Sequence, residues 1–110
     1  MPERRRETRL LCAELVEILW HDGADQARDG VANLEDISAI GACLLTEHHI
    51  PEGTQMAILH GDIRLEGVVR YCLKNEIGHF VGIEFPPDSR WSQDEFEPEH
   101  LLDPRQFETS

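Results

Sequence analysis

Segment 63–74 constrains the fold of this chain more strongly than any other part of the sequence. Small or apolar residues take every second position: Ile63, Leu65, Gly67, Val69, Tyr71 and Leu73. Charged residues fill most of the positions between them: Arg64, Glu66, Arg70 and Lys74. In an extended chain, successive side chains point to opposite faces, so residues two positions apart share a face. The segment is therefore predicted to be a β-strand that buries the face carrying Tyr71 and Leu73.

Three shorter segments also suit strands, and turn residues separate them. Residues 41–46 form a short apolar run, residues 55–60 alternate loosely, and residues 79–85 place every second side chain on one apolar face. Gly, Pro, Asn and Asp punctuate the sequence between these segments, so turns are expected at 51–54, 61–62 and 75–78. Short strands joined by such turns predict an all-β fold, either an antiparallel barrel or a sandwich.

The first third of the chain leaves two structures open. Residues 10–20 fit one face of a helix, but they are equally apolar and short enough for a strand. Residues 21–30 carry Asp-Gly at both ends and are expected to form a turn-rich loop. The runs on either side of that loop are compatible with a hairpin.

The chain has 110 residues, which is enough for one domain with a modest core. Residues 1–9 are expected to form a flexible, arginine-rich leader, and residues 10–86 the β-barrel. Two prolines end the β region at 86–87. Residues 87–110 are expected to form an acidic tail, with one short helical turn at 98–102.

Charge narrows the classes of function. The net charge of −12 disfavours binding to nucleic acid polymers and to anionic membranes. An anionic ligand would need a local basic site, and residues 4–9 hold four of the ten basic residues. The three cysteines are widely spaced, which predicts reduced thiols in a cytoplasmic protein. No secretory signal is visible, and no apolar stretch approaches the ~20 residues of a membrane span.

Two short motifs stand out, Arg5-x-x-x-Arg9 and the segment 36–41, which reads Asp36-Ile-Ser38-Ala-Ile-Gly41. Each alone is common, since the first could be a solvated basic leader and the second an ordinary turn. Together they have the order and separation found in the PilZ domain, and the chain resembles that family over residues 3–85. Further likeness is carried by four segments: 30–31, 41–44, 67–70 and 81–85. Ile40 departs from the pattern, because many members have a second glycine there.

The resemblance implies a six-stranded antiparallel PilZ-like β-barrel that binds cyclic di-GMP, often as an intercalated dimer. Arg5 and Arg9 match the arginine pair of the family, and Asp36, Ser38 and Gly41 match its second motif. The chemistry suits that ligand, because arginine forks onto phosphate or onto guanine O6 and N7. A carboxylate can accept from guanine N1–H and N2–H, and glycine permits a close backbone approach.

The expected function is that of a second-messenger receptor that signals through an unidentified protein partner and catalyses nothing. We expect no cofactor beyond the ligand cyclic di-GMP, and a monomer or weak dimer. No metal site is expected, because His48 and His49 are adjacent and no HxxxH spacing occurs. Ser38 lacks the surroundings of a catalytic nucleophile.

Two other interpretations remain open. A degenerate PilZ-like barrel that does not bind cyclic di-GMP would act only as a protein-interaction module. An oligonucleotide-binding barrel is disfavoured by the acidic charge and the few aromatic residues.

Overall fold

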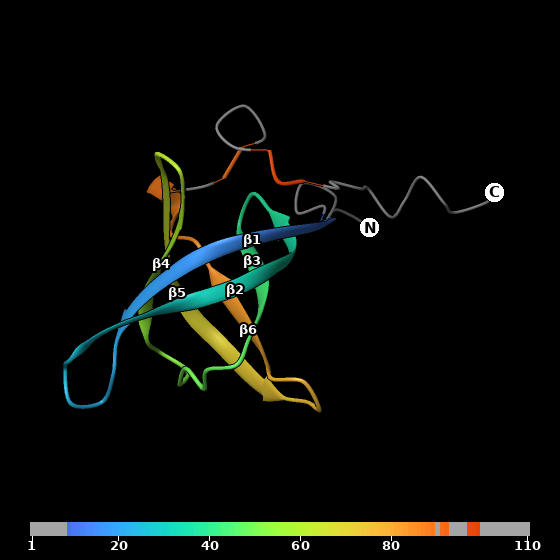
Figure 1. The fold of residues 1–110 in the computed structure, drawn as a ribbon. Coiled ribbons are helices and arrows are strands. Elements are labelled where there is room, and N and C mark those ends of the chain that lie inside the picture. The colour runs from blue at the N-terminus through green and yellow to red at the C-terminus, as the bar shows by residue number, and fades with distance from the viewer. Residues whose placement is uncertain (1–8, 90, 93–96, 100–110) are drawn as a thin grey trace, which may run out of the picture.

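The structure of the chain is a computed structural model, which describes residues 9–89, 91–92 and 97–99. Six antiparallel strands close into a barrel in the order β1-β2-β3-β6-β5-β4 (Figure 1). The strands are β1 (Leu10–His21), β2 (Ala27–Ser38), β3 (Gly41–Thr46), β4 (Gln55–His60), β5 (Ile63–Lys74) and β6 (His79–Glu84). A 3₁₀ turn, η2 (Pro87–Ser89), follows β6. The predicted six-stranded antiparallel barrel is confirmed.

Strand β1 resolves the ambiguity of residues 10–20 in favour of an extended chain. It pairs with β2 on one side and with β4 on the other, so its backbone polar groups are used by two neighbours. Every second side chain, Val16, Ile18 and Trp20, is buried in the barrel. This pairing with distant segments decides between helix and strand where local periodicity does not.

The loop between β1 and β2 is shorter than the sequence predicted. β1 continues through His21 and β2 begins at Ala27, so the expectation of a loop over the whole of 21–30 is wrong. The carboxylate of Asp22 accepts hydrogen bonds from the backbone N–H groups of Ala24 and Gln26. That local bonding closes the turn tightly enough for strand pairing to resume at once.

A β-bulge in β5 overturns the prediction that Tyr71 and Leu73 face the core. Val69 pairs with Ile83 and Tyr71 pairs with Gly82, so Arg70 is an extra residue without a partner on β6. One inserted residue moves every later side chain to the opposite face. Tyr71 and Leu73 consequently point outward, 38% and 59% exposed, whereas Cys72 packs against the core.

Apolar side chains from all six strands fill the barrel interior. Seven of the largest are fully buried: Ile18, Leu34, Ile37, Leu44, Ile58, Val69 and Val81. Burial of such a side chain stabilises the fold by about 1.5–3 kcal/mol. The predicted inward face of residues 81–85 is confirmed, since Val81, Ile83 and Phe85 are all buried.

The chain after β6 contacts the turn between β2 and β3. The backbone N–H of Phe85 donates to the carbonyl of Ile40, and that of Trp91 to the carbonyl of Ala39. Phe85 and Trp91 are both buried. Of the helical turn expected at 98–102, only Pro98 and Glu99 are among the described residues, so that prediction falls largely outside them. Within the described part of the chain, no helix has the length and apolar character needed to cross a membrane.

Candidate ligand-binding site

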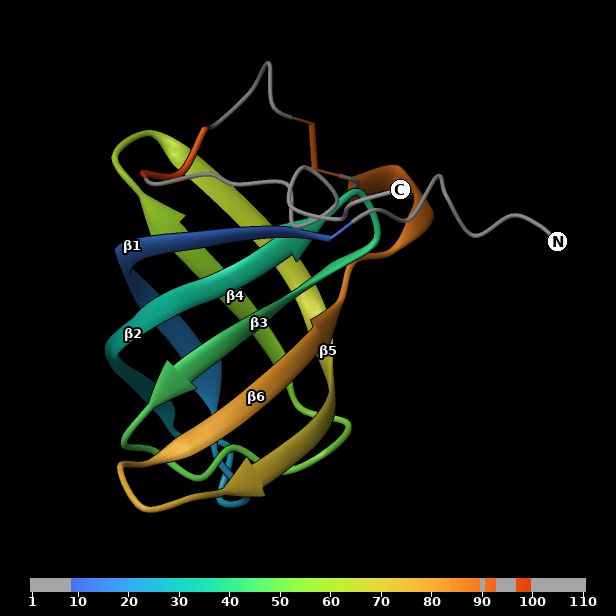
Figure 2. The same cartoon turned by 90° about the vertical axis from the view of Figure 1, so that its right-hand side faces the viewer.

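A cavity of about 390 Å³ opens on the outer face of the barrel, over β2, β3, β6 and β5. Figure 2 shows β3, β6 and β5 side by side across this face. Four of the five predicted site residues line the cavity: Arg9, Asp36, Ser38 and Gly41. The fifth, Arg5, lies outside the described residues.

One row of cross-strand neighbours forms the floor of the cavity. Asp36 on β2 pairs with Cys43 on β3, Cys43 with Gly82 on β6, and Gly82 with Tyr71 on β5. Both ends of the row lie at strand irregularities, between Leu34 and Asp36 and at the β5 bulge. Bulges re-aim side chains, so two departures from regular pairing place Asp36 and Tyr71 over the same surface.

Arg9 and Asp36 form a two-pronged ion pair at one wall of the cavity. Nη2 of Arg9 donates to Oδ2 of Asp36 at 2.6 Å, and Nε donates to Oδ1 at 3.3 Å. The Asp36 side chain is only 12% exposed, whereas that of Arg9 is 62% exposed. The hydrogen bond and the negative charge of Asp36 raise the pKa of Arg9 above its usual value. The guanidinium is therefore a permanent cation beside the cavity.

Ser38 and Gly41 shape the turn that borders the site. The buried hydroxyl of Ser38 accepts a hydrogen bond from the N–H of Ile40 at 3.2 Å and donates to the carbonyl of Gly41 at 3.4 Å. A Cβ at Gly41 would overlap the backbone carbonyl of Ile83 on β6. Both motif residues thus have a structural task, which is to hold the β2–β3 turn against β6.

Sequence reasoning missed Tyr71 as a site residue because alternation placed it inside the barrel. Its ring lies over Gly82, where an added Cβ would overlap the ring atoms. Burial, and then a hydrogen bond with the thiol of Cys43, raise the pKa of Tyr71 to about 12. Burial also raises the pKa of Cys43. At neutral pH the floor of the cavity therefore carries a neutral phenol and a neutral thiol.

A second ion pair lies on the far wall. Nε of Arg70, the bulged residue, donates to Oε1 of Glu84 at 2.6 Å, and both side chains line the cavity. Alternation along β5 placed Arg70 on the polar face, which left open whether it lines the site or is a solvated charge, and the structure places it at the cavity. Its pairing with Glu84, fourteen residues away, depends on the register of β5 against β6.

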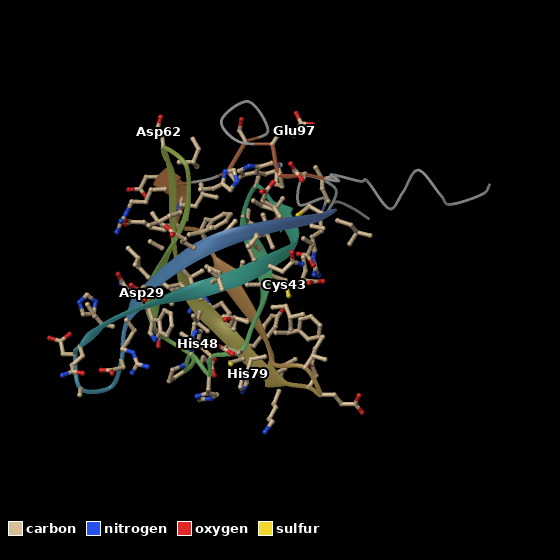
Figure 3. The ribbon with its side chains drawn as sticks, in the orientation of Figure 1. Asp29, Cys43, His48, Asp62, His79 and Glu97 are labelled. Carbon is tan, nitrogen blue, oxygen red and sulfur yellow. The ribbon has the colours of Figure 1, made fainter. Side chains whose placement is uncertain are left out.

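The histidines that the structure describes lie away from this cavity. His48 packs its ring against Trp20 at a centroid distance of 5.2 Å, and His49 contacts His79 at 5.5 Å. Figure 3 shows His48 and His79 below Cys43, toward the end of the barrel where β3 ends and β6 begins. Among the residues that the structure describes, no group of three or more His, Cys, Asp or Glu side chains is arranged to hold a metal ion.

The barrel and the lining of its cavity indicate a class of binding protein. A small closed barrel with a cavity walled by arginine–carboxylate pairs and floored by an aromatic ring is suited to bind an anionic, aromatic ligand. The sequence pattern of the PilZ domain family matches residues 3–97 of the 110. The chain therefore belongs to the PilZ domain family, whose members are generally cyclic di-GMP-binding modules. A comparison with curated proteins finds no match.

Proposed function

We propose that this protein is a receptor for cyclic di-GMP. The observation that supports this most directly is that Arg9 and the segment carrying Asp36, Ser38 and Gly41, which are far apart in the sequence, line one cavity. Arg5 belongs to the proposal through its place in the family motif. Binding and signalling are the whole of the proposed activity, with no catalysed reaction.

The cavity offers a contact to each part of such a ligand. Guanidinium groups bind phosphate oxygens or the O6 and N7 edge of guanine, and a carboxylate accepts from the opposite guanine edge. The half-exposed ring of Tyr71 presents a surface on which a base can stack. Each hydrogen bond to a charged group contributes roughly 1.5–3 kcal/mol. Three or four of them match the ~8 kcal/mol of a micromolar complex.

Binding would reorganise the Arg9–Asp36 pair. A ligand phosphate attracts the guanidinium of Arg9, and the Asp36 carboxylate is then free to accept from a guanine. The exchange replaces the ion pair with one contact between Arg9 and phosphate and one between Asp36 and guanine, so neither side chain is left without a partner.

The receptor would act in the cytoplasm by binding a protein partner. Apolar side chains beside the cavity support such a contact: Tyr71 belongs to the cavity itself, and Leu73 and Ile77 are exposed along the same hairpin. The same side chains support the second candidate, a barrel that acts only as a protein-interaction module. Ligand binding separates the two candidates.

Titration calorimetry with cyclic di-GMP tests the proposal, with GMP as the control nucleotide. We expect binding of cyclic di-GMP and much weaker binding of GMP, because GMP offers only one base and one phosphate. No heat at a cyclic di-GMP concentration of about 100 μM, a free energy of about 5.5 kcal/mol, would contradict the proposal. That outcome would favour the protein-interaction module.

A further inference from the structure

The bulge in β5 sends two consecutive side chains to the outer face of the barrel. Regular alternation would point one of Arg70 and Tyr71 outward and the other inward. Because Arg70 has no partner on β6, both residues line the cavity. Bulges that re-aim side chains commonly lie beside binding sites.

Arg70 and Glu84 mirror Arg9 and Asp36 across the floor of the cavity. Asp36 lies on β2 and Glu84 on β6, with β3 between them in the order of the barrel. Glu84 is the cross-strand partner of Gly41, the last residue of the second family motif. Each pair has a closest N–O distance of 2.6 Å. Among the described residues the site thus holds two cations, and each is neutralised by its own carboxylate.

The two pairs differ in how firmly the carboxylate is held. Asp36 is largely buried, whereas Arg70 and Glu84 are both more than half exposed. Exposed ion pairs contribute little net free energy, because water competes for both partners. A phosphate, with its bidentate geometry, can therefore displace Glu84 from Arg70 readily. The displaced carboxylate would stay beside the ligand as a like charge.

We propose that Arg70 is a third ligand-binding arginine of this site and that Glu84 restrains it and weakens the affinity for the anionic ligand. This inference rests on the proposed function, because it concerns the same cavity. Neither residue belongs to the two family motifs. The net charge of −12 repels an anionic ligand, so one additional cation at the cavity matters for attracting it.

Calorimetry with cyclic di-GMP on Arg70→Gln, Glu84→Gln and the double variant tests the inference. We expect Arg70→Gln to weaken binding about ten-fold, since one charge-assisted contact is lost. Glu84→Gln should tighten binding about three-fold or more, because it frees Arg70 and removes a like charge. The gain from Glu84→Gln should shrink when Arg70 is also replaced, since no guanidinium is then released.

A matched control lies on the same strand. Nε of Arg64 contacts Oε2 of Glu66 at 2.6 Å, both are half exposed, and neither lines the cavity. Arg64→Gln and Glu66→Gln change the net charge equally and should alter affinity less than two-fold, because surface charges at a distance are screened. Thermal melts by circular dichroism check that each variant is folded.

The outcomes separate the inference from the proposed function. Normal binding by Arg70→Gln, or a Glu84→Gln variant that binds no more tightly than Glu66→Gln, overturns the inference and leaves the receptor proposal intact. Absence of binding by both the unmodified protein and Glu84→Gln overturns both. Binding by Glu84→Gln alone would support the restraint by Glu84.

Discussion

The pKa of the Tyr71 side chain depends strongly on its surroundings in the barrel. It is the only tyrosine in the chain, so its ionisation can be followed without interference from another phenol. Burial and the Cys43 thiol favour the neutral phenol and raise its pKa to about 12. In the unfolded chain the pKa of tyrosine is about 10.

We predict that the absorbance change of tyrosinate near 295 nm has its midpoint at about pH 12 in the folded protein. The folded state keeps its proton between about pH 10 and pH 12, where the unfolded state has lost it. The stabilisation is therefore fully present below pH 10 and is lost as pH rises through the folded pKa. A midpoint at the unfolded value, in protein shown to be folded by circular dichroism, would contradict the assigned environment. Tyr71→Phe supplies the baseline.

Arg9 carries a second prediction at this scale. Arg9→Ala leaves the largely buried carboxylate of Asp36 without its partner, so we expect a loss of about 1–3 kcal/mol in the free energy of unfolding. We also expect weaker binding of cyclic di-GMP. Urea denaturation and calorimetry measure the two effects, and Arg28→Ala is the control, because its partner carboxylate, Asp22, is more exposed than Asp36. Equal stability of the two variants would show that the Arg9–Asp36 contact stabilises the fold no more than a surface pair does.

At the scale of the elements, the site depends on close contact between β3 and β6. The two strands pair along their whole length, from Gly41 opposite Glu84 to Thr46 opposite His79. Gly41 allows this approach because any side chain would meet the carbonyl of Ile83. The motif glycine therefore positions the β2–β3 turn, with the Ser38 hydroxyl bonded inside it.

We predict that Gly41→Ala destabilises the fold by about 1–3 kcal/mol, because backbone atoms of β3 or β6 must shift. Gly23→Ala is the matched control, since no atom lies within 4 Å of a Cβ placed there. It should change stability by less than about 0.5 kcal/mol. Chemical denaturation followed by tryptophan fluorescence measures both. A Gly41→Ala variant as stable as Gly23→Ala would show that the strands separate without cost.

For the whole molecule, acidic charge dominates. With a net charge of −12 on 110 residues, the acidic side chains repel one another in the folded state. The ion pairs that oppose this repulsion are mostly on the surface, where each contributes little. Salt screens repulsion between distant charges more than contact within a pair.

We therefore predict that the melting temperature rises when sodium chloride is increased from about 0.01 M to about 0.15 M, over which the Debye length falls from about 30 Å to about 8 Å. Differential scanning calorimetry at constant pH measures it, with potassium chloride as the control for specific ion effects. A melting temperature that falls with salt would mean that attraction within ion pairs outweighs the overall repulsion.

Local sequence determined the architecture of this protein to a large extent. Turn residues at 61–62 and 75–78 and the apolar alternation at 81–85 encode short antiparallel strands, because both depend only on neighbours in the chain. The motif residues Arg9 and Asp36 were identified differently, from the resemblance to the PilZ domain, because their two motifs occur in the order and separation found in that family. Their roles in ligand binding remain predictions.

The tertiary structure decided those features of the chain that depend on pairing with another strand. Residues 10–20 became a strand because β2 pairs with them on one side and β4 pairs with residues 17–20 on the other. Tyr71 turned outward because the register of β5 against β6 leaves Arg70 unpaired. Strand register is set by the fit of two distant segments, and a shift of one residue reverses every later side chain. Alternation within a single strand contains no information about that shift, so the place of Tyr71 in the site and the pairing of Arg70 with Glu84 emerged only when the barrel closed.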